Sequence, residues 1–208
     1  MSNKTFVVGL IILLFLLVSY EYTIAGGPWK GKIIDIETKE PIEGAVVLAV
    51  WERVYRTPAG ASSYFYEAKE VLTDKEGRFE IPSYTPINLV PLISYMRGPL
   101  FTIFKPGYGS LQMAVGQYLT GEVPRDFLTG QIKAVWDFEL SEKKYRLTPG
   151  LIELPSLKTR EERRMAKPTP VGDKKDWKKQ KEFIRLIREE WKYLTGKPAG
   201  DLYQIEED

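Results

Sequence analysis

The most constraining feature of the sequence is a series of short segments in which apolar and polar residues alternate, separated by turns rich in Gly and Pro. In chain order these segments are residues 29–36, 44–55, 64–73, 78–82, 100–105 and 132–140. A period of two places every second side chain on the same face, as in a β-strand. Because no helical pattern separates them, we expect a mainly β chain folded as an antiparallel β-sandwich rather than a parallel α/β sheet.

One turn between these segments is well marked. Asp74-Lys-Glu-Gly77 precedes the fourth segment, and its glycine can adopt the positive φ that a hairpin loop requires. Phe79 and Ile81 follow at alternate positions. We therefore expect a hairpin whose return strand directs both of these side chains into the core.

Four motifs, met in a fixed order along the chain, carry a resemblance to a known family. They are GKIID at residues 31–35, TKEPIEGAVV at 38–47, TDKEGRFEI at 73–81 and FKPGY at 104–108. Together they resemble the carboxypeptidase regulatory-like domain of bacterial type, over residues 28–145. The resemblance implies a transthyretin-like (prealbumin-like) antiparallel Greek-key β-sandwich. Residues 53–64 and 83–99 are longer than the minimal pattern requires.

The sequence contains no His and no Cys, which excludes several kinds of chemistry. A Ser-His-Asp triad, a Cys-His nucleophile, a zinc site built from His or Cys, and a disulfide are all impossible. The resemblance implies an accessory, non-catalytic domain, because the zinc domain of metallocarboxypeptidases needs His ligands. Hydroxyisourate hydrolase shares the sandwich but needs histidines and a terminal Tyr-Arg-Gly-Ser, whereas this chain ends in Ile-Glu-Glu-Asp208. We expect no enzyme activity, no cofactor and no metal site.

The amino-terminal part resembles an export signal. Residues 6–18 form an uncharged apolar run, shorter than the about 20 residues that a spanning helix needs. Thr23-Ile24-Ala25 offers small residues before Gly26, which predicts a signal peptide over residues 1–25. The alternative is an uncleaved helix that anchors the protein in the inner membrane. Both interpretations place the remainder outside the cytoplasm, in the periplasm or secreted, and the lack of cysteine favours a bacterial or archaeal envelope.

The carboxy-terminal part differs in composition from the predicted sandwich at residues 26–148. Residues 149–208 form a densely charged extension with helices expected near 156–166 and 174–194. In the second helix, one apolar stripe contains Trp177, Ile184, Ile187, Trp191 and Leu194. The stripe either docks on the sandwich or contacts a membrane or a partner, and both interpretations stay open.

Six exposed aromatic or basic residues are candidates for an interaction surface. They lie on the third strand segment and on the second helix: Tyr64, Tyr66, Trp177, Lys178, Lys181 and Trp191. The function we expect is a non-enzymatic module with a structural or protein-interaction role in the cell envelope. Its partners would be an envelope protein, a glycan, or the membrane through residues 6–18, whereas export removes the chain from nucleic acids.

Two other functions compete with this expectation. Tyr64 and Tyr66 would stack on sugars in a carbohydrate-binding module. A carboxylate-dependent hydrolase would need two facing acids among the strand residues Glu52, Glu67, Glu70 and Glu80. Lys30 or Lys32 with Asp137 or Glu139 would imitate the isopeptide bonds of pilin relatives, although alternating strand charges normally face water.

Overall fold

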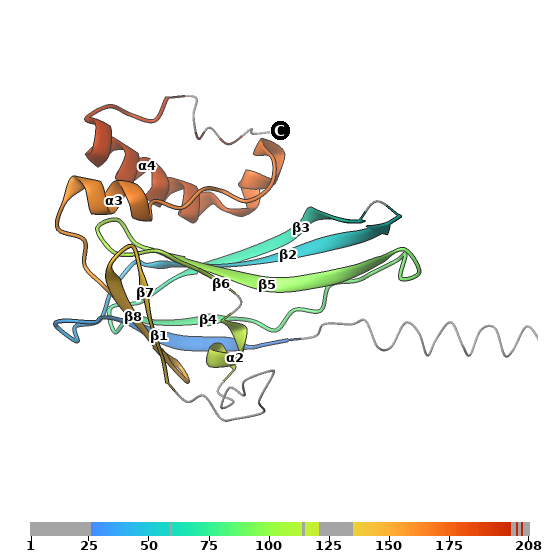
Figure 1. Ribbon diagram of the computed structural model, residues 1–208, viewed down its shortest axis with the longest axis horizontal. Helices are drawn as coiled ribbons and strands as arrows, with labels where there is room; N and C mark the ends of the chain where they lie inside the picture. Colours follow the sequence, from blue (N-terminus) through green and yellow to red (C-terminus); the bar gives the residue numbers. More distant parts are fainter. Residues whose placement is uncertain are drawn as a thin grey trace, which may run out of the picture.

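The computed structural model describes residues 26–58, 60–113, 115–120, 135–200, 203 and 205. Figure 1 shows two stacked β-sheets with the carboxy-terminal helices above one of them. The chain is mainly β, as the alternating pattern predicted. The predicted signal or anchor at residues 1–25 lies outside the described residues. Among the described residues, no helix has the length and apolar character needed to cross a bilayer.

Each sheet combines strands that are distant in sequence. The first sheet has the order β4 (Arg78–Ile81), β1 (Trp29–Asp35), β9 (Leu151–Leu154), β8 (Lys143–Thr148) and β7 (Trp136–Leu140). The second has the order β3 (Gly60–Leu72), β2 (Val46–Thr57), β5 (Ser94–Phe104) and β6 (Leu111–Met113). Neighbouring strands are antiparallel except β1 and β9, which are parallel.

The main core lies between the two sheets. Trp29, Trp51 and Phe101 pack together there, with ring centroids 5.6 and 5.8 Å from Trp29. Phe79 and Ile81 are buried in the same cluster, so their predicted inward orientation is confirmed. Gly77 has a φ of 74°, and a β-carbon there would collide with the Ile33 carbonyl oxygen, which explains the glycine at this turn.

The first sheet continues past the predicted boundary at residue 148. The hairpin between β8 and β9 passes through Gly150, whose φ is 74°. β9 then lies between β1 and β8, with Ile152 and Leu154 fully buried. β9 has only four residues, with Ile152 and Leu154 in the core and Glu153 paired with Lys39, and so short a run carries too little alternation to indicate a strand.

In the part of the extension that the structure describes, there are three helical elements rather than two. They are α3 (Arg160–Ala166), the 3₁₀ helix η1 (Lys174–Lys179) and α4 (Lys181–Thr195); the short α2 (Gly116–Leu119) precedes β7. The single helix predicted over 174–194 is interrupted at Gln180, which is fully buried and has a φ of −134°. Its side-chain amide donates to the Val171 carbonyl (2.7 Å) and accepts from the Val171 N–H (3.2 Å), and this local bonding holds residue 180 outside the helical conformation.

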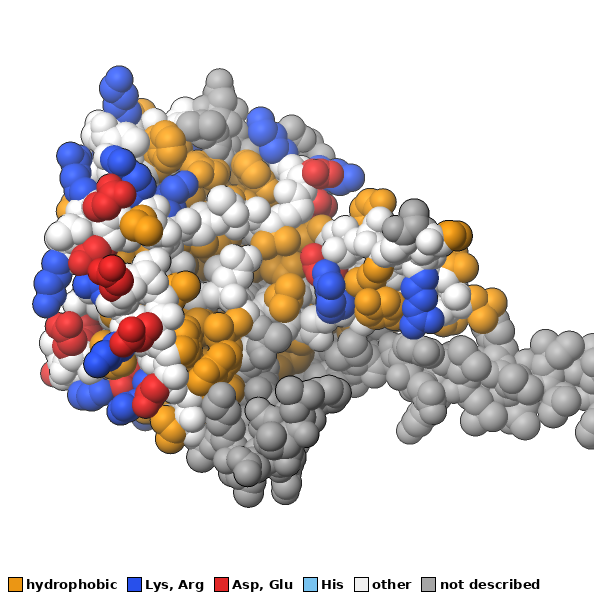
Figure 2. Space-filling view, in the orientation of Figure 1, with side chains coloured by type: hydrophobic (Ala, Val, Ile, Leu, Met, Phe, Trp, Pro, Cys, Tyr) orange, Lys and Arg blue, Asp and Glu red, His pale blue; other side chains and the backbone are white. Residues whose placement is uncertain are grey.

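α4 covers the outer face of the second sheet, so the docked interpretation of the apolar stripe describes this structure. A second cluster joins Phe183, Leu186 and Ile187 of α4 to Val46, Leu48, Val50, Ala68 and Phe104 of the sheet. The Phe183 and Phe104 rings meet edge to face with centroids 6.2 Å apart. Figure 2 shows that charged side chains gather at the end of the molecule near α3, while hydrophobic side chains are prominent at the opposite end.

Candidate functional site

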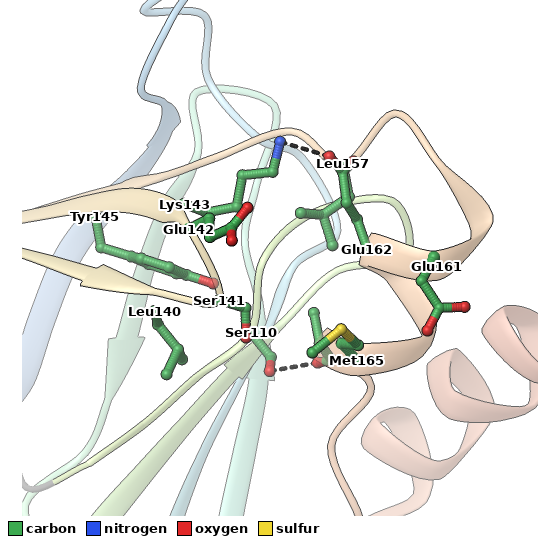
Figure 3. A pocket seen from close by; sticks show the side chains of 11 residues that line it. Ser110, Leu140, Ser141, Glu142, Lys143, Tyr145, Leu157, Glu161, Glu162 and Met165 are labelled. Atoms are coloured by element: carbon green, nitrogen blue, oxygen red, sulfur yellow. Dashed lines mark hydrogen bonds and ion pairs between the residues drawn. The ribbon is translucent and has the colours of Figure 1, made fainter.

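A cavity of about 460 Å³ opens between α3 and the turn that joins β7 to β8. Figure 3 shows its lining, to which β8, the 140–143 turn, the segment before α3 and α3 itself contribute. The lining residues are Ser110, Leu140, Ser141, Glu142, Lys143, Tyr145, Leu157, Glu161, Glu162, Met165 and Ala166. None of these residues was predicted from the sequence to form a site.

The wall of the cavity is largely apolar. Leu140 and Met165 stand at the mouth with 50% and 65% of their surface exposed, and Leu157 is buried. Tyr145 forms part of the lining, and burial raises the pKa of its hydroxyl to about 12. Its hydroxyl lies so close to Gly109 that a β-carbon there would collide with it. An apolar wall together with exposed apolar side chains at the mouth is suited to bind an apolar group.

An ion pair closes one side of the mouth. Lys143 Nζ on β8 lies 2.8 Å from the Glu162 carboxylate on α3. The same carboxylate accepts hydrogen bonds from the Lys158 and Thr159 backbone N–H groups (2.8 and 3.0 Å), as the reciprocal half of a capping box. The Lys143 hydrogen bond and these two N–H groups together lower the pKa of Glu162 to about 2. The pair therefore connects the start of α3 to the sheet.

Two further contacts hold α3 over the cavity. The Ser110 hydroxyl donates to the Ala166 carbonyl at 2.5 Å. On the other side, the Arg163 guanidinium makes two hydrogen bonds to Glu190 of α4, of 2.7 and 2.6 Å. The cavity is thus formed before any ligand arrives, with its walls fixed from the sheet and from α4.

The polar groups of the cavity suit binding better than catalysis. The Ser110 hydroxyl is committed to a carbonyl oxygen, and the Lys143 ammonium to Glu162. In the part of the chain that the structure describes, no group of three or more acids could hold a metal ion. The rim carries three carboxylates, on Glu142, Glu161 and Glu162, against one ammonium group. A ligand with an apolar group beside a cation would therefore complement it.

The two tyrosines predicted for an interaction surface have different environments. Tyr64 is 58% exposed, and its ring contacts that of Tyr55 with centroids 5.7 Å apart. Tyr66 is half-buried, its hydroxyl donates to the Ile87 carbonyl (3.1 Å), and the Arg53 guanidinium lies 4.9 Å above its ring. Tyr64 alone of the predicted pair is available for stacking, and neither residue lines the cavity.

The four predicted residues of the carboxy-terminal helices also lie outside the cavity. Trp177 of η1 and Trp191 of α4 both contact Tyr203, with ring centroids 6.1 and 6.2 Å apart. Lys178 lies in η1, and Lys181 is exposed at the start of α4. The structure thus brings the two tryptophans together around one tyrosine.

The carboxylates considered for hydrolysis do not face one another. Glu52 pairs with Arg97, Glu67 with Lys179 and Glu80 with Lys30. Glu70 accepts the backbone N–H groups of Glu182 and Phe183 (2.8 and 3.0 Å), and burial raises its pKa. The isopeptide geometry is absent too, because β9 and β8 separate β1 from β7.

Comparison with protein-family models, with curated proteins and with solved structures finds no match to this chain.

Proposed function

We propose that this chain is a non-enzymatic module of the cell envelope that binds a partner protein through the cavity beneath α3. The observation that supports it best is the preformed cavity of about 460 Å³, with Leu140 and Met165 exposed at its mouth and an excess of carboxylates on its rim. The ligand would be an apolar side chain of the partner next to a Lys or Arg. The commitment of Ser110 and Lys143 to other contacts favours binding over chemistry.

The proposal includes a transthyretin-like Greek-key fold of the carboxypeptidase regulatory-like type. It is supported by the path of the chain, which forms the β2–β3 hairpin in one sheet and then crosses to pair β4 with β1 in the other. An envelope location is supported by the apolar run at residues 6–18 and by the absence of cysteine. In this account the extension is structural, since α4 covers one sheet and α3 completes the cavity.

Co-purification from envelope fractions of the source organism tests the proposal. Met165→Gln and Leu140→Gln make the mouth polar with little change in size, and both positions are exposed, so folding should be kept. A specific partner should be retained by the original chain and by the control Leu72→Gln, which changes an exposed leucine outside the cavity. The amount of this partner recovered should fall at least fivefold with Met165→Gln or with Leu140→Gln. Equal recovery with all four chains would refute the proposed site.

Glycan binding is a second candidate, and the exposed Tyr64 ring beside Tyr55 favours it. These residues line a separate hollow of about 370 Å³ together with Arg53, Phe65 and Tyr66. An array of envelope polysaccharides, probed with the original chain and with Tyr64→Ala, tests it. Binding that disappears with Tyr64→Ala would support this function, and no binding by the original chain would eliminate it.

A further inference from the structure

An apolar loop stands at the end of the sandwich opposite α3. It joins β4 to β5, and Ile87, Leu89, Leu92 and Ile93 are 64%, 80%, 69% and 54% exposed. Residues 81–96 contain no charged side chain. Figure 2 shows hydrophobic side chains gathered at this end, where the tips of β2, β3 and β5 meet. Scattered exposed leucines are ordinary, but four in seven consecutive residues form a patch that indicates an interaction surface.

Several polar groups of this loop are hydrogen-bonded within the protein. The Asn88 side-chain Nδ2 donates a hydrogen bond to the Ser94 carbonyl oxygen at 2.9 Å. In return, the Ser94 hydroxyl donates to Asn88 Oδ1 at 3.0 Å. The Val90 carbonyl accepts the Ile93 and Ser94 N–H groups, at 3.2 and 3.1 Å. This internal bonding lowers the cost of moving the loop toward a less hydrated layer, because polar groups that lose water without another partner are destabilising.

Strand contacts fix the loop in place. The Arg56 N–H donates to the Ile93 carbonyl at 2.9 Å, and the Ile87 carbonyl accepts from Tyr66 and Arg53 at 3.1 and 3.3 Å. The apolar side chains therefore project from a supported scaffold and do not fold back over the strands.

The surroundings of the loop are basic and aromatic. Arg53 and Arg56 lie at the end of β2, and Arg56 stands 5.2 Å from the ring centre of Tyr95. Tyr64 is exposed at the same tip. Apolar tips surrounded by tyrosines and arginines match the interfacial layer of a bilayer with anionic lipids, where the rings lie at headgroup level and the cations contact phosphates.

The path of the chain places this loop close to the apolar run. Gly26 and Tyr84 exchange backbone hydrogen bonds of 3.4 and 3.1 Å, so the described chain begins beside the β4–β5 connection. Seven residues lie between Val18 and Gly26, and the eight residue steps from one to the other span only about 28 Å even when fully extended. A membrane that held residues 6–18 would therefore lie near residues 87–93.

We infer that residues 87–93 insert into the lipid–water interface of an anionic membrane and orient the sandwich with the α3 cavity facing away from the bilayer. This inference rests on the envelope location in the proposed function. The lipid-binding surface that it adds is separate from the cavity beneath α3.

The absence of cysteine from the chain allows a direct test. Leu89→Cys and Leu92→Cys, each labelled with a polarity-sensitive fluorophore, report on the loop in the full chain bound to vesicles of phosphatidylethanolamine and phosphatidylglycerol. Lys75→Cys is the control, because it is exposed on the turn at the far end of β3, about 40 Å away at strand rise. Flotation measures vesicle association separately.

We expect blue-shifted emission at positions 89 and 92, with at least twofold quenching by nitroxide lipids, and water-like emission at position 75. Floating protein with water-like emission at all three positions would overturn the inference and leave the envelope role intact. A blue shift without lipid quenching would also overturn it, because the loop would then be covered by protein, such as a second copy. Failure to float would refute both the inference and the membrane-held form of the envelope role.

Discussion

The Arg163–Glu190 pair offers the most informative perturbation of this structure, because it connects α3 to α4. The two side chains form paired hydrogen bonds, and they are 14% and 1% exposed. Arg163 also lies 3.5 Å from the ring centre of Tyr193. The two partners are therefore not equivalent: Arg163 also contacts the Tyr193 ring and is partly exposed to solvent, whereas Glu190 is almost fully buried.

The magnitudes follow from this difference. Arg163→Met leaves the Glu190 carboxylate buried without its partner, which should cost about 3–5 kcal/mol. Glu190→Leu leaves an arginine that still contacts Tyr193 and solvent, so we expect a smaller loss of about 1–2 kcal/mol. Arg163→Met with Glu190→Leu removes both charges and should return to within about 1 kcal/mol of the original chain.

Urea unfolding followed by circular dichroism measures these free energies, and melting supports them, since about 1 kcal/mol shifts the midpoint by about 2–4 °C in a protein of this size. The matched control is Arg185→Met on the exposed face of α4. Arg185 is 48% exposed and pairs with Glu182 and Glu189, so its loss should stay below about 1 kcal/mol. The reasoning is refuted if Arg163→Met costs no more than Arg185→Met, or if the double variant is as unstable as Arg163→Met.

Three further predictions concern single contacts. Gly77→Ala should destabilise the protein by more than about 2 kcal/mol, because the new β-carbon would collide with the Ile33 carbonyl oxygen and the residue has a positive φ. Gly196→Ala also has a positive φ but open space around it, so it should cost about 1 kcal/mol. Urea unfolding of both variants separates the steric from the torsional contribution. Glu70→Ala should cost about 1–2 kcal/mol, because it removes the carboxylate that accepts the Glu182 and Phe183 N–H groups at the start of α4. The control Glu80→Ala, at an exposed position, should cost less than about 0.5 kcal/mol. Equal losses of stability in the two variants would contradict the capping role of Glu70. The folded-state pKa of Glu162 is depressed, so its contribution is present above its unfolded value of 4.5 and is lost as the pH falls toward about 2; melting between pH 5 and 2 should therefore fall more steeply for the original chain than for Glu162→Gln, and parallel curves would contradict this.

Much of the sandwich could be predicted from the sequence, because alternation and turn chemistry are local signals. The inward orientation of Phe79 and Ile81 and the positive φ of Gly77 followed from residues near them in the chain. β9 could not be found this way, since it has only four residues and its place between β1 and β8 is set by strands that are distant in sequence. The interruption at Gln180 was hidden for a similar reason, because its side-chain bonds go to Val171 in the preceding linker.

The candidate site was harder to predict than the fold. The cavity exists only because α3 is held by Lys143, Ser110 and Glu190, which are far apart in sequence. In the sequence, the charged members of this group look like any solvated charge of the extension. In the structure Thr159 caps α3, and Glu162 completes its capping box while also pairing with Lys143.

The most direct test of the central claim is site-specific photo-crosslinking in the source organism. Benzoylphenylalanine replaces Met165 at the cavity mouth or, as a control, Arg188 on the exposed face of α4. The account predicts one discrete protein adduct from position 165 that Leu140→Gln weakens, and no such adduct from position 188. No adduct at position 165, or the same adducts from both positions, would contradict the claim that this cavity binds a partner protein.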